Sequence, residues 1–483
     1  MNLHTKKLLN DAKNKRTEEV LKDLEYDDVD INAQGENKQT ILHYAALQQH
    51  PDIIHKALTF KNIDVNRTDK FDKSTLTYAA KNGNTECVRL LLSHMDIDVN
   101  LKSFDWSCKG YTPLHYAVKH GHIECIKLLL AHRHIAVNIQ NDDSWTSLYC
   151  AVSSHQINIE CIKLLLAHKD ADVNIRVNKY FDEGYTVLHK AAKNGQVECV
   201  KMLLDCKNIH VNVQDYHGMT PLSHAVSHYG IECTKALLSH ADTSLTMRDK
   251  SGVSVLHAAV RIRNVALLPL LLSREDIEVN MEDKDGLTPL HYALILRYTD
   301  AAAAILAHRD TDINSVSREG KSALFYAVSA HSREGVSLVL SQAGVCVNEQ
   351  DSRGQTALHH AAEADAAALV ELLLLHPRIA INTRDSRGRT PLHCACEHAS
   401  ASAAALLLSH PAIRVNAEDA QGHTPLDVVE AHHASPLQNN RSGGDTQRRS
   451  QIGAISELLR LQGGLTATQL HSSSLFSLSA SAE

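Results

Sequence analysis

Aromatic residues are scarce in this chain of 483 residues, which has only 2 tryptophans and 6 phenylalanines. Long apolar runs are also missing: LLPLLL at 267–272 is among the longest, whereas a membrane-spanning helix needs about 20 apolar residues. The net charge of -7 is small for this length, so it indicates no general affinity for nucleic acid or anionic membranes. We therefore expect a protein that neither inserts into membranes nor binds nucleic acid.

The sequence also lacks a secretory signal, because its N-terminal segment MNLHTKKLLNDAKNKR is polar and typical of a helix start. The 11 cysteines are an odd number, and without an export signal we expect them to be reduced thiols. These features predict a cytoplasmic protein, with the nucleus as an alternative location.

A repeat organises most of the chain. Each copy starts at a Thr or Ser, here called the anchor, and continues as x-Leu-x-x-Ala, with Val429 in place of Ala in the last copy. The anchors are Thr40, Ser74, Thr112, Thr146, Thr186, Thr220, Ser254, Thr288, Ser322, Thr356, Thr390 and Thr424. Nine of the eleven steps between anchors are 34 residues; those from 74 to 112 and from 146 to 186 are 38 and 40. Such a period predicts a stack of similar units.

The pattern of one unit predicts two helices and a connecting segment. The anchor is an N-cap residue, and a proline such as Pro113 suits the first helical position, where an amide N–H has no partner. Leu114 and Ala117 share a helical face, and a turn glycine such as Gly121 precedes a second apolar helix. One such pair cannot bury its own apolar face, so neighbouring units must stack.

The stretch GYTPLHYAVKHGHIECIKLLL resembles an ankyrin repeat, and the resemblance covers roughly residues 36–461. It implies an all-α fold: an ankyrin-repeat α-solenoid of antiparallel helix pairs, with a short β-hairpin finger projecting between repeats. The period here is one residue longer than the usual 33. We expect a helical capping unit at 1–35, about twelve repeats at 36–461 with a polar insertion at 434–450, and a disordered tail at 462–483.

Histidine and cysteine recur at fixed repeat positions, which argues against a metal or catalytic site. Seven histidines lie three residues after an anchor, where the resemblance implies a hydrogen-bond bridge between neighbouring repeats: His43, His115, His189, His257, His291, His359 and His393. Equivalent residues lie about 10 Å apart in such stacks, too far to share an ion whose ligands sit about 2 Å away. With no nucleophile, zinc or phosphate-binding motif in the chain, we expect no enzyme, no metal and no cofactor.

The two long steps produce two long fingers, at 101–111 and 175–185, each four residues longer than the others. Extra length on a surface finger indicates function, and exposed aromatic residues are preferred anchors of protein interfaces. The aromatic residues of these fingers and of the finger between them are Phe104, Trp106, Tyr111, Trp145, Tyr180, Phe181 and Tyr185. We predict that they bind a partner; the alternative is that they pack on neighbouring fingers.

Arginines gather in the C-terminal fingers, at Arg318, Arg353, Arg384, Arg387 and Arg389. They could bind an acidic or phosphorylated segment, with Arg353, Arg387 and Arg389 as the candidates, or form a solvated face with the interleaved acids. The C-terminal half also lacks the turn glycine, whose place is taken by Arg263, Arg297, His331, Asp365 and Ala399. If that position is left-handed, each of these residues is strained, so we expect the C-terminal half to be less stable.

The resemblance further implies possible modification by the oxygen-dependent asparaginyl hydroxylase. The matching pattern places an Asn eight residues after a Leu, at Asn32, Asn66, Asn100, Asn174, Asn280 and Asn314. The alternative is that these asparagines only organise the finger turns.

These observations predict a monomeric scaffold or adaptor that binds a protein partner along the face formed by the fingers and the first helices. Two alternatives stay open: a substrate-recognition subunit of a ubiquitin ligase or another multi-protein enzyme, and a host-directed effector. A ligase subunit needs a docking segment outside the repeats, and only 432–483 has room for one.

Overall fold

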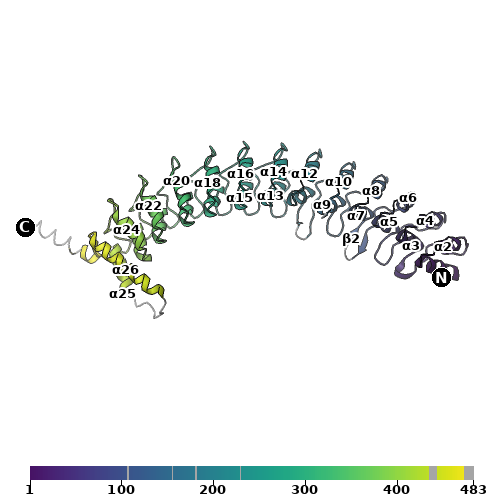
Figure 1. The fold of residues 1–483 in the computed structure, drawn as a ribbon, viewed down its shortest axis with the longest axis horizontal. Helices are drawn as coiled ribbons and strands as arrows, with labels where there is room; N and C mark the ends of the chain where they lie inside the picture. Colours follow the sequence, from purple (N-terminus) through teal and green to yellow (C-terminus); the bar gives the residue numbers. More distant parts are fainter. Residues whose placement is uncertain are drawn as a thin grey trace, which may run out of the picture. The chain divides into compact units, whose positions relative to one another are not determined.

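Helix pairs follow one another along the described part of the chain (Figure 1). The computed structural model describes residues 1–105, 108–154, 156–179, 182–228, 230–434, 443–470 and 472, with the backbone alone at 105, 432–434 and 443–446. Contacts within the chain divide it into two units, Met1–Lys250 (unit 1) and Ser251–Glu483 (unit 2).

Unit 1 begins with a helix pair that lacks the anchor pattern, α1 (Leu3–Lys13) and α2 (Thr17–Asp23), as expected for the capping unit. A short 3-10 turn, η1 (Glu36–Lys38), precedes the first anchored repeat. The first helices of the six anchored repeats are α3 (Ile41–Gln48), α5 (Thr75–Asn82), α7 (Pro113–Lys119), α9 (Ser147–Ser153), α11 (Val187–Lys193) and α13 (Pro221–Ser227). Their second helices are α4 (Pro51–Ala57), α6 (Thr85–Leu92), α8 (Ile123–Leu130), α10 (Ile159–Leu166), α12 (Val197–Leu204) and α14 (Ile231–Leu238).

Unit 2 repeats the arrangement six times. The first helices are α15 (Val255–Arg261), α17 (Pro289–Ile295), α19 (Ala323–Ser329), α21 (Ala357–Glu363), α23 (Pro391–His398) and α25 (Pro425–Ala434). The second helices are α16 (Leu267–Leu272), α18 (Thr299–Leu306), α20 (Arg333–Leu340), α22 (Ala367–Leu374), α24 (Ala401–Ser409) and α26 (Gly443–Leu461).

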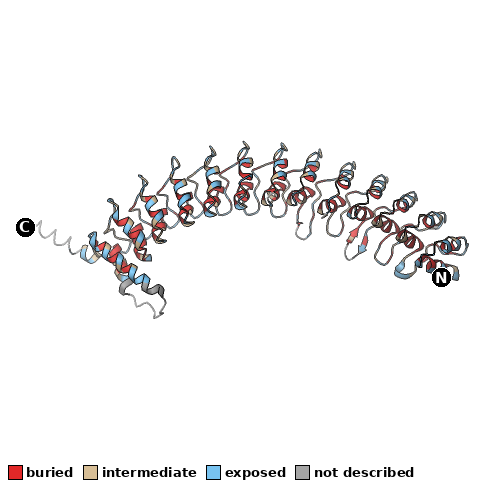
Figure 2. Ribbon diagram, viewed as in Figure 1, coloured by how far each residue is buried: buried red, intermediate tan, exposed pale blue. Residues whose placement is uncertain are grey.

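Within each unit the first helices pack side by side in one layer and the second helices in another. The buried residues of each pair face the space between the two layers and the neighbouring repeats (Figure 2). Five cysteines at one position of the second helices belong to this core: Cys87, Cys125, Cys161, Cys199 and Cys233. Burial raises the pKa of the Cys87 thiol to about 11, which keeps it protonated at neutral pH. The all-α solenoid predicted from the period is therefore confirmed.

Histidine bridges join consecutive first helices, and His115 is representative. Its Nδ1 accepts the backbone N–H of the anchor Thr112 at 3.3 Å, so the ring proton lies on Nε2. Nε2–H then donates to the carbonyl oxygen of Trp145 in the next repeat, at 3.0 Å. The same Nε2 contact, to the carbonyl oxygen of the residue before the next anchor, joins His43 to Lys73, His189 to Met219, His257 to Leu287, His359 to Arg389 and His393 to His423. His291 differs, because its Nε2 reaches the carbonyl oxygen of Ser315, earlier in the next finger.

A ladder of asparagines forms a second bridge between repeats. The Asn66 side chain donates from Nδ2 to the carbonyl oxygen of Asp96 at 2.6 Å and accepts the N–H of Asp98 on Oδ1 at 2.8 Å. Both atoms of the amide are therefore used inside the stack, and the equivalent asparagines make the same pair of contacts.

The fingers are mostly tight turns. Among the described residues only one finger contains strands, β1 (Ser103–Asp105) and β2 (Cys108–Tyr111), which pair antiparallel. A typical finger is closed by an aspartate: Asp385 Oδ1 accepts the N–H groups of Arg387 and Arg389, both at 2.9 Å. The aspartate side chain thus satisfies backbone N–H groups that the partner strand would satisfy in a longer hairpin.

The C-terminal end of the array differs from the prediction. Helix α26 starts at Gly443, so residues 443–450, expected in a polar insertion, are helical. Residues 463–467, expected in the disordered tail, continue the asparagine ladder: Asn416 donates to the carbonyl oxygen of Gly463 and accepts the N–H of Leu465. The step to the next capping residue, Thr466, is 42 residues and lacks the Leu and Ala of the pattern, which is why the sequence did not reveal it. Residues 473–483 lie outside the described part of the chain.

The turn between the two helices of a repeat is left-handed, as expected. Gly83, Gly121 and Gly195 have φ between 69° and 72°, and their non-glycine counterparts in unit 2 have φ between 49° and 59°. Because a side chain at positive φ costs about 1 kcal/mol, the five non-glycine turns of unit 2 carry a strain that glycine avoids. The lower stability of the C-terminal half stays a prediction, which slower hydrogen exchange there than in unit 1 would contradict.

Substitutions at this turn should have opposite effects on the free energy of unfolding in the two units: loss of a glycine should lower it in unit 1, and introduction of a glycine should raise it in unit 2. A Cβ added at Gly195 meets no atom within 4 Å, so Gly195→Ala should cost about 1 kcal/mol through conformation alone. Arg297 is exposed and has φ 56°. The variant Arg297→Gly should therefore be more stable than the variant Arg297→Ala, again by about 1 kcal/mol. Urea unfolding of the three variants tests this, and equal stability of the two Arg297 variants would contradict it.

Acid should weaken the stack through its histidine bridges. Burial lowers the pKa of His115 to about 4 and that of His189 to about 3, against about 6.5 in an unfolded chain. The unfolded state therefore binds protons first, and stability present above about pH 6.5 is lost as the pH falls toward 4. By pH 5 the loss should be on the order of 2 kcal/mol for each such histidine, so the urea midpoint should fall between pH 7 and pH 5. His115→Gln should show a smaller fall, and a midpoint that rises at pH 5 would refute the assignment.

Candidate functional site

Two departures from the period lie in neighbouring repeats of unit 1. The first is the long finger at 101–111. The second is the turn between α9 and α10: α9 ends at Ser153 and α10 begins at Ile159, whereas α7 and α8 are separated by three residues. Thus the six additional residues between Thr146 and Thr186 divide into two at this turn and four in the next finger.

A hollow of about 1050 Å³ lies where these two departures meet. Its lining comes from the last residue of the finger 101–111, the next finger, the helices α7, α9 and α10 and the turns that follow α7 and α9: Tyr111, Val118, Lys119, His120, Gly121, Asp143, Trp145, Cys150, Ala151, Ser153, Ser154, Gln156, Ile157, Asn158, Ile159, Glu160 and Cys161. Trp145 is half-buried, and Ile157 is 39% exposed. The hollow therefore combines apolar surface with a few charged groups, which is typical of a binding site.

The prediction that Tyr111 is an exposed contact residue is wrong, because its ring forms the floor of the hollow. Tyr111 packs in a core cluster with Tyr116, Cys108 and Cys150, and Trp145 lies against this cluster. Burial raises the pKa of the Tyr111 phenol far above its usual value. The alternative of packing between neighbouring fingers therefore holds for this residue.

The close approach of the two fingers depends on Gly110. Its φ is 72°, and a Cβ added there would lie 2.6 Å from the backbone nitrogen of Asp142 in the next finger. The backbone of Asp142 donates to the carbonyl oxygen of Lys109 at 3.2 Å. Only glycine allows this contact, so the long finger is held against the finger that carries Trp145.

Phe104 is the exposed aromatic residue of the long finger, with 49% of its surface accessible. The ammonium of Lys109 lies 5.8 Å from the centre of its ring. Trp106, in the same finger, lies outside the described residues. Phe104 is therefore exposed, as predicted from the sequence.

In the second long finger the prediction of an exposed Tyr185 is also wrong. Tyr185 is 3% exposed and its ring lies 4.7 Å from that of His224. His224 in turn shares a hydrogen bond of 2.8 Å between its Nε2 and the Oδ2 of Asp215. All three residues are buried, so this Asp–His–Tyr chain is not accessible to a substrate and stabilises the finger. Tyr180 and Phe181 lie outside the described residues.

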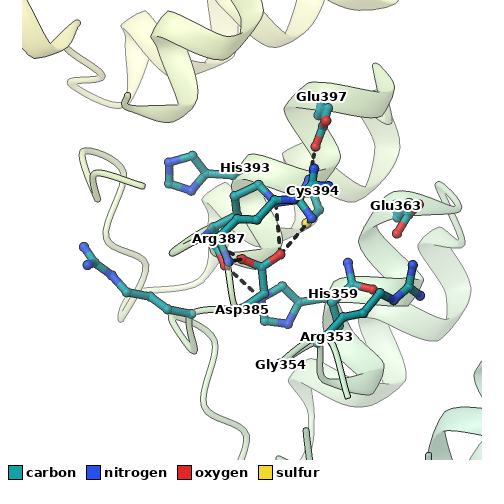
Figure 3. Close-up of polar contacts among 12 residues, drawn as sticks. Arg353, Gly354, His359, Glu363, Asp385, Arg387, His393, Cys394 and Glu397 are labelled. Carbon is teal, nitrogen blue, oxygen red and sulfur yellow. Dashed lines mark hydrogen bonds and ion pairs between the residues drawn. The ribbon is translucent and has the colours of Figure 1, made fainter. Parts of the chain in front are cut away.

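The C-terminal arginines divide into exposed and internal residues (Figure 3): Arg318, Arg353, Arg384 and Arg387 are exposed and Arg389 is half-buried, so the basic strip stays one of the two predicted alternatives. Arg389 binds Asp385 Oδ2 through Nε at 2.9 Å and Nη2 at 2.8 Å, and its Nη1 contacts Glu397. Burial alone would raise the pKa of Asp385, but hydrogen bonds from Arg389 and the backbone outweigh it and hold the pKa below the usual value. Arg389 is therefore an internal residue of its finger.

Arg353 and Arg387 are exposed. Arg353 Nε lies 3.6 Å from Asp351 Oδ2. Arg387 lines a smaller hollow of about 380 Å³ together with Arg389, His393, Glu397, Asp419, Gln421, His423, Asp427, Val428 and Ala431. Since acidic and basic residues alternate around it, this hollow selects no single sign of charge.

The six asparagines proposed for hydroxylation belong to the asparagine ladder. The carbonyl oxygens that accept from their Nδ2 atoms are those of Asn62, Asp96, His134, Asn208, Asp310 and Gly344, in the order of the asparagines along the chain. Modification stays a proposal, and an enzyme that needs an extended peptide would first have to open this ladder.

Other chemistries find no support in the described part of the chain. No group of three or more histidine, cysteine or acidic side chains is arranged to hold a metal ion there. None of the helices in the described ranges has the length and apolar character needed to cross a bilayer.

Comparisons with known proteins agree with the geometry. A family model described as ankyrin repeats (3 copies) matches residues 8–103, 100–177, 160–249, 230–317, 256–351, 305–385 and 324–419. One matching solved structure is the ankyrin repeat domain of Bcl-3, described as a unique member of the IkappaB protein family; it is 28% identical, with a TM-score of 0.41, over 44% of this chain and 95% of that chain. A comparison with curated proteins gives no match.

Substitution of the two finger arginines should separate a structural from a surface role. Arg389→Ala leaves the buried Asp385 carboxylate without its ion pair and should destabilise the protein by about 3 kcal/mol. Arg387→Ala removes an exposed side chain of the same finger and should change stability by less than about 0.5 kcal/mol. Urea unfolding measures both, and equal effects would contradict the assignment of Arg389.

Proposed function

Because the chain belongs to the ankyrin-repeat family, we propose that it is a protein-interaction scaffold whose unit 1 takes a segment of a partner into the hollow beside Trp145. Ankyrin repeats are in general protein–protein interaction modules, and repeat arrays present extended surfaces of this kind. The observation that carries the proposal is one hollow bounded by Tyr111, the last residue of the long finger, and by the lengthened turn 154–158.

The composition of this surface supports the proposal. Trp145 and Ile157, which line the hollow, and Phe104, in the finger that ends at Tyr111, offer accessible apolar area in a chain that has few large aromatic residues. A few such residues supply most of the free energy of a protein interface, while the surrounding contacts mainly exclude water. Chain length added at the surface beyond the repeat period is also more often functional than stabilising.

The alternatives gain no observation of their own. A ligase subunit needs a docking helix outside the array, but α26 packs on α24 and α25 as the second helix of the last repeat. A host-directed effector differs from a scaffold by where it acts, and no described residue bears on that.

Removal of the exposed apolar residues should abolish partner binding without unfolding the array. We expect the double variant Phe104→Ala/Ile157→Ala to capture at least tenfold less of each protein that the unchanged chain captures specifically from the native cell. Quantitative mass spectrometry measures the captured amounts. A matched control is Met95→Ala/Leu375→Ala, which removes two other exposed apolar side chains. Trp145→Ala, checked for folding by circular dichroism, is the second variant. Unchanged capture by both test variants would refute the proposed site.

A further inference from the structure

A row of lysines and serines follows the same side of unit 1. From the second to the sixth anchored repeat, the residues seven positions after the anchor are Lys81, Lys119, Ser153, Lys193 and Ser227, and each ends or nearly ends its first helix. Because the helices α5, α7, α9, α11 and α13 pack in sequence, these side chains lie in one row, one per repeat. Lys119 and Ser153 also line the hollow of the proposed function.

The three ammonium groups of this row lie against aromatic rings. Lys119 Nζ is 5.4 Å from the ring centre of Tyr111, Lys193 Nζ is 5.0 Å from that of Tyr185, and Lys81 Nζ is 5.8 Å from that of Tyr116. The hydrogen bonds of Lys119 and Lys193 go to Cys108 Sγ and Tyr185 OH and not to carboxylates. Among the described residues no carboxylate lies within ion-pair distance of these three lysines, so their charge is not neutralised.

The two serines of the row, Ser153 and Ser227, are half-buried, and their Oγ atoms lie below the surface. A peptide lying on the surface does not reach these atoms, so the binding chemistry of the row is that of its lysines.

Resting on the proposed function, we propose that this row binds an extended acidic segment of a protein partner, its Asp and Glu side chains on Lys81, Lys119 and Lys193. Neighbouring helices lie about 8–10 Å apart, and three residues of extended chain span about 10 Å. Since Lys119 is one repeat from Lys81 and Lys193 is two repeats farther, the acidic residues should be spaced i, i+3 and i+9.

The spacing and number of the cations favour a peptide over nucleic acid. A nucleic-acid strand presents a phosphate far more often than once in 10 Å, and tight binding to it requires many contacts. Here one lysine per repeat is interrupted by a serine, and the carboxylates Asp143 and Glu160 also line the hollow. A segment with separated carboxylates fits this pattern.

The test uses the full chain and a fluorescein-labelled glycine–serine peptide with glutamates at i, i+3 and i+9. Lys81→Gln/Lys119→Gln/Lys193→Gln should weaken binding in fluorescence anisotropy about tenfold, because each exposed ion pair contributes up to about 1 kcal/mol. The matched control is Lys127→Gln/Lys201→Gln/Lys235→Gln, which removes three lysines paired with glutamates on the second helices. The control should bind as the unchanged protein does.

Carbodiimide cross-linking gives a direct readout, since it joins a peptide carboxylate to a lysine amine as an amide with loss of water. Mass spectrometry should find the peptide on Lys81, Lys119 and Lys193. Equal weakening by both triple variants, equal binding of a peptide with adjacent glutamates, or no binding would overturn the acidic-segment proposal. If these arms fail while Phe104→Ala/Ile157→Ala still loses its partners, the scaffold stands and only the acidic chemistry is wrong.

Discussion

The histidine bridge is the interaction on which the stacking of repeats most depends. A single helix pair leaves an apolar face open, so hydrophobic burial requires a neighbour but does not fix its position. The imidazole does fix it, because one nitrogen must accept from the anchor while the other donates to the next repeat, as His115 does between Thr112 and Trp145. The protonated ring would lose the first contact, so each bridge demands a neutral, buried histidine.

This constraint explains where variation is tolerated. Each bridging histidine spans the finger that follows its own repeat, as His115 spans the finger that ends at Trp145. The two long fingers, 101–111 and 175–185, follow the repeats in which Thr77 and Tyr149 occupy the histidine position, so no histidine bridge has to span either insertion. Insertions therefore collect on one surface, and two of them in neighbouring repeats are enough to shape a hollow.

The sequence predicted the framework well because the framework repeats. The caps, the bridging histidines and the left-handed turns each recur many times, so chance agreement is excluded and one physical reason serves all copies. Arg297 and His331 even adopt the strained turn that glycine occupies elsewhere, since stacking on both sides determines the backbone there. The end of the array was missed at Thr466, where the period itself is broken.

The candidate site was predicted less well because its residues occur once. Tyr111 and Tyr185 were taken as exposed from their place in long fingers, but whether a finger side chain turns inward depends on its neighbours in three dimensions. The Gly110 contact pulls one finger against the next and covers Tyr111. Ile157 was overlooked because only four of the six additional residues between Thr146 and Thr186 were assigned, all to the finger, and the two between α9 and α10 were left without a place.

Charged side chains at equivalent positions of the two units have different partners: carboxylates in unit 2 form ion pairs, and ammonium groups in unit 1 lie over aromatic rings. In unit 2 the residues seven positions after the anchor include Glu363 and Glu397, and these pair with His398 and Arg389. In unit 1 the same position holds Lys81, Lys119 and Lys193, which lie over tyrosine rings, and a leucine or serine in the other three repeats. A cation–π contact orients an ammonium group without cancelling its charge, whereas an ion pair does both. Unit 1 therefore keeps its lysines positioned and still positively charged, and the entropy of ordering them is already lost before a carboxylate arrives.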